Sequence, residues 1–408
     1  MPDRPSQNPS SGQNPPSEAL HSTGVVHEIR WSEICPWLIL IKSLRAAFFL
    51  RVLVLAAIGV ALTQAGWVVI AGQLAPELEM TLSPRDELPT PILSDDPREL
   101  IETVRPARWQ SGSPISGWYW LMTPLLKLAN QELTTPMRIC HVLCGLWAVF
   151  VWAFFGGMIC RITALSLARD QVLGLVWSAR DALSQWMATL GGLAIILAAL
   201  LALALPLTLL GMLLRIDLLV LVSALVWLVL LAWGLAIAIV AVGLVLGWPL
   251  LWTCQAVEQS DAFDGVSRCY AYVYQRPLPL AFFAVVAVVL SLLGDQVVTL
   301  FVELSNSACE TAIASGMGAD RAQLVLAGDL ESSPVPLATK LIVWWRWCFR
   351  LVAESFPLAC LWTMSVGIYL LQRRLIDQTE MDEIALPDKQ KSSESSVAQD
   401  SGSQASSS

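Results

Sequence analysis

The chain has 408 residues, of which 55% are hydrophobic and only 14% are charged, about half the charged share of a soluble protein. Its formal net charge is −8, and the sequence lacks a basic stripe, so nucleic acid is excluded as an expected partner. Residues 218–253 contain no charged side chain. Because about 20 apolar residues cross a bilayer core, the composition predicts an integral membrane protein.

The predicted fold is an all-α, polytopic transmembrane helix bundle with interfacial amphipathic helices and disordered tails. Residues 1–43 are expected to form a disordered and interfacial N-terminal tail, and residues 376–408 a disordered C-terminal tail. The transmembrane domain is expected at 44–375. Its apolar runs predict about six spans, at roughly 52–72, 139–159, 187–213, 218–247, 278–300 and 342–371.

Two apolar segments need a separate argument for how they lie relative to the membrane. The run 218–254 is too long for one untilted crossing, but no polar turn residue is present to divide it into two. We therefore expect one tilted span that ends near Gly247-Trp248-Pro249 and continues as an interfacial segment to Cys254. Residues 117–122, Gly-Trp-Tyr-Trp-Leu-Met, are predicted to lie on the membrane face.

Basic residues predict the orientation. Lys42, Arg45 and Arg51 precede the first span and place the N-terminus in the cytoplasm. Six spans return the C-terminus to that side, where the short segments carry Arg161, Arg169, Arg180, Arg268, Arg276, Arg373 and Arg374. No cleavable signal peptide is visible in the polar first 40 or so residues. The expected location is the cell (inner) membrane.

Two cytoplasmic segments have helical apolar stripes. The first is 164–186, expected to be a surface helix or an extension of the second span. The second is 258–277, where Ser260 is the expected N-cap and Asp264 is spaced to pair with Arg268. The plain interpretation of the second is an interfacial helix with ordinary capping. The functional interpretation is a surface that docks a cytoplasmic partner or a lipid headgroup, with Glu258, Asp261, Asp264, Arg268, Tyr270 and Arg276 as its candidate residues.

The second segment reads Glu258-x-x-Asp-Ala-Phe-Asp-x-x-Ser-Arg-x-Tyr-x-Tyr-x-x-x-Arg-Pro277. This pattern resembles one in an uncharacterised bacterial family of polytopic membrane proteins, as does the stretch from Cys160 to Asp170. The resemblance covers roughly residues 140–375. It implies membership and topology, and it implies no activity.

Charged residues inside the last two spans form a second candidate site, made of Asp295, Arg346, Arg350 and Glu354. The last three recur every fourth residue, and Asp295 on the fifth span is expected at a similar depth to Glu354. Intramembrane charge is costly and is usually paired or functional. One interpretation is a structural cluster that locks two helices, so that Asp295→Asn lowers thermal stability. The other is a proton- or ion-handling site.

Two further motifs are weak. Cys140-His141-x-x-Cys144 lacks a complete ligand set, so we expect ordinary packing there and no metal site. Gly243-x-x-x-Gly247 permits close contact between helices. The nine cysteines show no pairing pattern that indicates a disulfide framework.

Function remains open between three classes. The sequence has no Gly-x-x-x-x-Gly-Lys-Ser/Thr loop, no His-Glu-x-x-His and no Gly-x-Ser-x-Gly. We therefore expect a non-enzymatic membrane component that needs no cofactor and docks partners or lipids through the cytoplasmic segments 164–186 and 255–276. Its expected partners are the lipid bilayer and a possible cytoplasmic or membrane protein, with the oligomeric state open. The alternatives are a small transporter or permease subunit that uses Asp295, Arg350 and Glu354, and, behind it, an intramembrane enzyme acting on lipid.

Overall fold

The computed structural model describes residues 35–74, 114–128, 134–170, 174–318, 321–322, 325, 335–381 and 383–384. Within these ranges the chain forms helices and no strand, which confirms the predicted all-α class. Six helices are long and apolar enough to cross a membrane, as expected for a multi-pass membrane protein. They are α3 (Leu50–Leu74), α8 (Thr135–Arg169), α9 (Leu175–Leu213), α11 (Trp227–Glu258), α13 (Pro277–Met317) and α15 (Pro336–Ile376).

Five shorter elements accompany the spans within the described residues. They are η1 (Pro36–Leu38), α2 (Ile39–Ala47), α7 (Pro114–Lys127), α10 (Asp217–Leu225) and α12 (Ala262–Gln275). Local sequence explains several helix ends. Proline occupies the first turn of α8, α13 and α15, where its missing N–H costs nothing. Asp170 and Gln259 end α8 and α11 in the left-handed conformation, with φ of 51° and 53°.

The core of the bundle packs α2, α3, α7 and α8 against the second part of α15 and the last turns of α11. Four indoles meet in its interior. Trp252 stacks on Trp362 at a centroid distance of 5.1 Å, and Trp152 and Trp248 contact Trp362 at 6.1 and 5.4 Å. All four are buried. Close packing requires glycine nearby, since a Cβ on Gly156 would lie 2.9 Å from the Trp362 ring.

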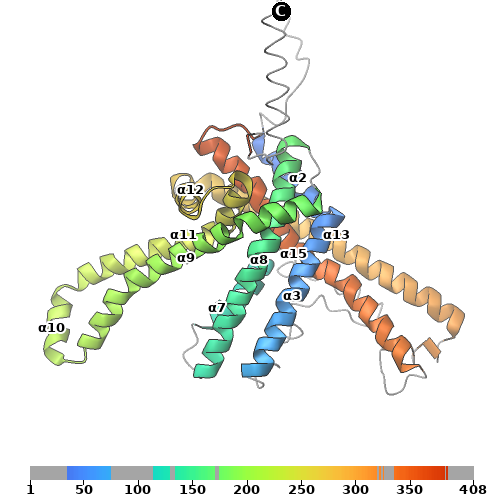
Figure 1. The fold of residues 1–408 in the computed structure, drawn as a ribbon, viewed down its shortest axis with the longest axis horizontal. Coiled ribbons are helices and arrows are strands. Elements are labelled where there is room, and N and C mark those ends of the chain that lie inside the picture. Colours follow the sequence, from blue (N-terminus) through green and yellow to red (C-terminus); the bar gives the residue numbers. More distant parts are fainter. Residues whose placement is uncertain are drawn as a thin grey trace, which may run out of the picture.

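Two helical arms spread away from this core (Figure 1). In the first arm, α9 and α11 run side by side and α10 lies at the tip. The Trp233 indole N–H donates to the Leu203 carbonyl at 2.8 Å and holds the two helices together. In the second arm, α13 pairs with the first part of α15. In the most apolar 18-residue stretch of α9, and likewise of α11, only 6% of the residues are buried. The corresponding share in α15 is 83%.

Helix length explains why the arms are tilted. α3 has 25 residues, whereas α9 has 39 and α13 has 41. At 1.5 Å per residue these helices are about 38, 58 and 62 Å long. In Figure 1 the far ends of both arms nevertheless reach the same level as the lower ends of α3 and α7. A helix of about 58 Å that reaches the same level as α3 must lie at an angle to α3, as both arms do in Figure 1.

The predicted fourth span is wrong in its boundaries. The apolar run divides at Val226 into α10 and α11, without any polar turn residue. The helix also does not end at Trp248-Pro249. Pro249 lies inside α11, and the Thr253 hydroxyl donates to the Pro249 carbonyl at 2.8 Å. The segment expected to lie at the interface is the most buried part of α11, because it packs against α8 and α15 in the core.

Other boundaries also differ from the predictions. The segment 164–186 is not one helix, since α8 ends at Arg169 and α9 begins at Leu175. Residues 117–122 belong to α7, which packs against α8 and α15 with Trp120 and Leu121 buried. The bundle begins before residue 44, because α2 is packed against α15. It also includes the start of the predicted C-terminal tail, where Ile384 is buried. The rest of the two predicted tails, 1–34 and 385–408, lies outside the described residues.

Candidate functional site

Polar side chains gather at one end of the bundle, which we call the apex. The apex consists of the C-terminal ends of α8, α11 and α15, together with α12 and the residues that follow α15. Residues from both segments that have helical apolar stripes in the sequence lie here. Glu258, in the second segment, pairs with Arg373 of α15, which the sequence patterns did not connect to it.

Glu258, the last residue of α11, is the centre of this apical network. Its carboxylate pairs with Arg268 of α12 at 2.5 Å and with Arg373 of α15 at 3.1 Å. The Tyr369 hydroxyl donates to the same carboxylate at 2.6 Å. The Glu258 side chain is only 12% exposed and that of Arg373 only 10%. Three helices are thereby tied to one buried carboxylate.

The residues after α15 add two connections. The Tyr272 hydroxyl of α12 donates to the Asp377 carboxylate. The Arg373 guanidinium donates to the Glu383 carbonyl at 2.5 Å. The chain beyond α15 is therefore fastened to both α12 and α15 at the apex.

The surroundings of α12 keep Arg268, Cys269 and Tyr272 protonated at neutral pH. Burial by itself would lower the pKa of the Arg268 guanidinium, but the bonds to Asp264 and the charge of Glu258 raise it above its ordinary value. Burial, followed by the Asp377 carboxylate, raises the pKa of the Tyr272 phenol. Burial also raises the pKa of the Cys269 thiol to about 12. At neutral pH, Arg268 is cationic and Tyr272 is a hydrogen-bond donor.

α12 rests on the Gly243-x-x-x-Gly247 motif of α11, so the prediction that this motif permits close contact is confirmed. A Cβ on Gly243 would lie 2.4 Å from the Tyr270 ring, and one on Gly247 would lie 2.4 Å from the Cys269 sulfur. The close approach lets the Tyr270 hydroxyl donate to the Val240 carbonyl at 2.8 Å. The Cys269 thiol donates to the Gly247 carbonyl at 3.0 Å.

Arg161 of α8 makes a second buried contact, which sequence reasoning missed. Its side chain is 1% exposed and pairs with Asp181 of α9 at 3.0 Å. It also donates to the carbonyls of Ala256 and Val257 at 3.2 and 3.4 Å. These carbonyls belong to the last turn of α11, which has no helical partner for them. Arg161 thus caps α11 while joining α8 to α9.

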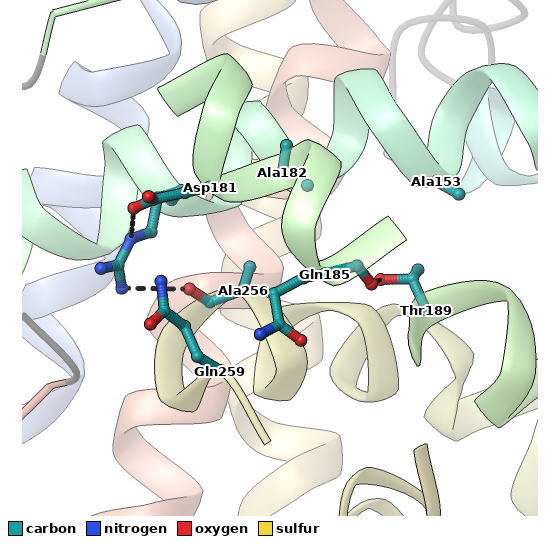
Figure 2. A pocket seen from close by; sticks show the side chains of 9 residues that line it. Ala153, Asp181, Ala182, Gln185, Thr189, Ala256 and Gln259 are labelled. Atoms are coloured by element: carbon teal, nitrogen blue, oxygen red, sulfur yellow. Dashed lines mark hydrogen bonds and ion pairs between the residues drawn. The ribbon is translucent and has the colours of Figure 1, made fainter. Parts of the chain in front are cut away.

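A small pocket lies beside Arg161. Asp181, Gln185 and Gln259 are among its lining residues (Figure 2). Its volume of about 10 Å³ is the room of about one water molecule. The pocket therefore suits an ordered water and is far too small for an organic substrate.

The predicted docking residues of 258–276 fall into two groups. Glu258 and Tyr270 face the bundle, as described above. Asp261 and Arg276 are exposed, and the side chains of Asp264 and Arg268 are 43% and 37% exposed. The predicted pair of Asp264 and Arg268 is confirmed at 3.0 Å. The predicted N-cap is wrong, because Asp261 rather than Ser260 accepts the N–H of Asp264, at 2.8 Å.

The intramembrane charges are distributed over the second arm. Arg346 pairs with Glu310 of α13 at 2.7 Å, a partner that the sequence did not indicate. Arg350 acts electrostatically on Glu354 along α15. Asp295 is 7% exposed and takes part in no ion pair among the described residues. The expected pairing of Asp295 with Arg350 is therefore not seen among the described residues.

Cys140 and Cys144 are buried in the N-terminal part of α8, and the His141 imidazole Nδ1 lies 2.7 Å from the Met137 carbonyl. Cys144 also helps to join α8 and α3, since its carbonyl accepts the Trp67 indole N–H at 2.9 Å. Groups of three or more residues able to hold a metal ion do not occur among the described residues.

Comparison with known proteins adds no relative. No protein-family description, curated protein or solved structure matches this chain.

Proposed function

We propose that this protein is a non-enzymatic membrane component that docks a partner protein through the outer face of α12. The single observation that carries this proposal is the contrast between the two faces of α12. Gly265, Cys269, Tyr272 and Val273 are buried on its inner face. Phe263 is 72% exposed on the outer face, beside exposed Ser267 and Tyr274. A helix that is firmly fixed and presents an aromatic side chain outward is suited to recognition.

The charges around Phe263 favour a protein over a lipid surface. A helix that binds membrane lipids usually flanks its apolar residues with Lys and Arg. Here Asp261 and Asp264 flank Phe263 instead. The complementary partner is a protein surface with an apolar pocket for Phe263 and basic groups around it.

The proposal includes the location. We place the apex on the cytoplasmic side of a bacterial inner membrane, in keeping with the sequence resemblance. The support is the positive-inside rule, since exposed basic residues at the apex include Lys42, Arg45, Arg180, Arg276 and Arg374.

Site-specific photo-crosslinking tests the docking surface. A benzophenone amino acid replaces Phe263 in the full chain, and the native membrane is illuminated. We expect one discrete protein adduct, identified by mass spectrometry. The matched control is Leu225 at the tip of the first arm, which is 88% exposed. Adducts with lipid alone at both positions would contradict the proposal.

Labelling of intact cells with an impermeant maleimide tests the orientation. Ser267→Cys places a thiol on the exposed face of α12, whereas the native Cys309 is exposed on α13 in the second arm. We expect Cys309 to be labelled in intact cells and the new thiol only after lysis. The reverse pattern would invert the topology.

A further inference from the structure

Asp295 lies where α13, α15 and α2 meet. A Cβ on the preceding Gly294 would lie 2.9 Å from the Leu44 side chain and 3.0 Å from the Phe356 ring. One turn further along, Val298 packs against the buried cluster of Ala47, Phe356 and Cys360. The Asp295 carboxyl, 7% exposed, therefore sits in apolar surroundings within a membrane-spanning helix.

Among the described residues, Asp295 takes part in no ion pair with a positive charge. On its own helix, Ser291 is fully buried one turn earlier. From α15, the Cys360 thiol lies within interaction range of both Ser291 and Asp295. On α15, Arg346 pairs with Glu310 and Arg350 acts electrostatically on Glu354. On α2, Lys42 and Arg45 are exposed, and Ser43 donates to the Ile39 carbonyl.

An ionised carboxylate is costly in such a place. Without a counter-charge, a carboxylate in an apolar environment takes up a proton instead of remaining charged. A neutral carboxylic acid keeps one O–H donor and can bond with a hydroxyl or thiol. Ser291 and Cys360 are side chains of this kind, and both are buried at the same helix contact.

We propose that Asp295 is an intramembrane proton-binding site, with Ser291 and Cys360 as its polar neighbours. The ligand is a single proton on the carboxyl. The site is separate from the apical network and does not depend on the docking surface of α12. It differs from the ionic cluster expected from the sequence, because Asp295 takes part in no ion pair among the described residues.

Carbodiimide labelling of the full-length protein in its native membrane tests this site. A protonated carboxyl adds across a C=N bond of dicyclohexylcarbodiimide. Its oxygen bonds to the central carbon and its proton passes to nitrogen, so an ionised carboxylate does not react in this way. We expect mass spectrometry to find the adduct on Asp295, with roughly tenfold less at pH about 9 than at pH about 6. Glu310, paired with Arg346, is the internal control and stays unmodified.

A second measurement does not depend on access of the reagent. Asparagine resembles a protonated aspartic acid in shape and charge, and it does not titrate. The carboxyl of the unfolded wild type ionises above about pH 4, so from there upward the wild type should lose stability relative to Asp295→Asn. The two melting temperatures should match only at the acid end of the range. A variant that is destabilised at all pH values would overturn the proposal. Equal labelling by a water-soluble carbodiimide would also overturn it, because it would show an exposed carboxylate.

Discussion

Arg268 of α12 and Arg373 of α15 meet at the same carboxylate, that of Glu258, at 2.5 and 3.1 Å. The two cations are tolerated close together because this carboxylate lies between them. The contact is partly buried, with Arg373 10% and Arg268 37% exposed. Arg268 and Arg373 therefore share the Glu258 carboxylate as a counter-charge, and this carboxylate links α12 to α15.

Replacing Glu258 by glutamine should destabilise the protein by about 2–4 kcal/mol, because it leaves a buried guanidinium without its counter-charge. The check is the melting temperature of the purified protein in mild detergent. Asp264→Asn is the matched control. Asp264 pairs with the same Arg268 but is 43% exposed, so its loss should cost about 0–1 kcal/mol. Equal effects of the two variants would show that Glu258 is not the centre of the network.

Arg161→Lys should also lower the melting temperature. A lysine keeps the charge beside Asp181 but lacks the planar fork that reaches the Ala256 and Val257 carbonyls at the same time. We expect a loss of about 1–3 kcal/mol, the cost of leaving buried acceptors without donors. Arg180→Lys is the control, since Arg180 is exposed on α9. A lysine variant as stable as the wild type would argue against the capping role.

Gly243→Ala should displace the Tyr270 ring, which lies 2.4 Å from the position of the new Cβ, and so loosen α12. The check is alkylation of Cys269, which is 1% exposed, followed by mass spectrometry. We expect faster labelling in the variant. Gly234→Ala on the same helix is the control, because nothing lies within 4 Å of its Cβ position. Its helix should be unchanged or stabilised, by up to about 1 kcal/mol. Unchanged labelling in Gly243→Ala would contradict the packing role.

Local features of this fold were predictable from sequence, whereas contacts between distant segments were not. The pair of Asp264 and Arg268 follows from their spacing on one helix, and the glycines at 243 and 247 indicate a close contact without naming α12 as its partner. The ion pair of Glu258 and Arg373 depends on tertiary packing, so no local pattern contains it.

The errors in α11 have a similar cause. Trp248 and Pro249 suggest a helix end because proline removes a backbone donor. In the folded protein the stretch around them is buried against α8 and α15, and packing keeps it helical. The helix breaks at Val226, a residue that is neither polar nor glycine, near the tip of the first arm.

Tyr272→Phe tests the connection between α12 and the chain after α15, and its effect should depend on pH. The phenol donates to Asp377, and the folded state raises its pKa above the ordinary value of about 10. A group of this kind stabilises the fold fully below its unfolded pKa and loses that contribution as pH rises through the folded pKa. At pH about 8 the wild type should therefore be more stable than Tyr272→Phe by about 1–2 kcal/mol. The difference should shrink as pH rises above about 10, where the unfolded phenol ionises. Melting curves of the two proteins in detergent across this range provide the measurement. A constant difference would mean that ionisation of Tyr272 is not coupled to folding, and that the hydrogen bond to Asp377 does not hold the chain at the apex.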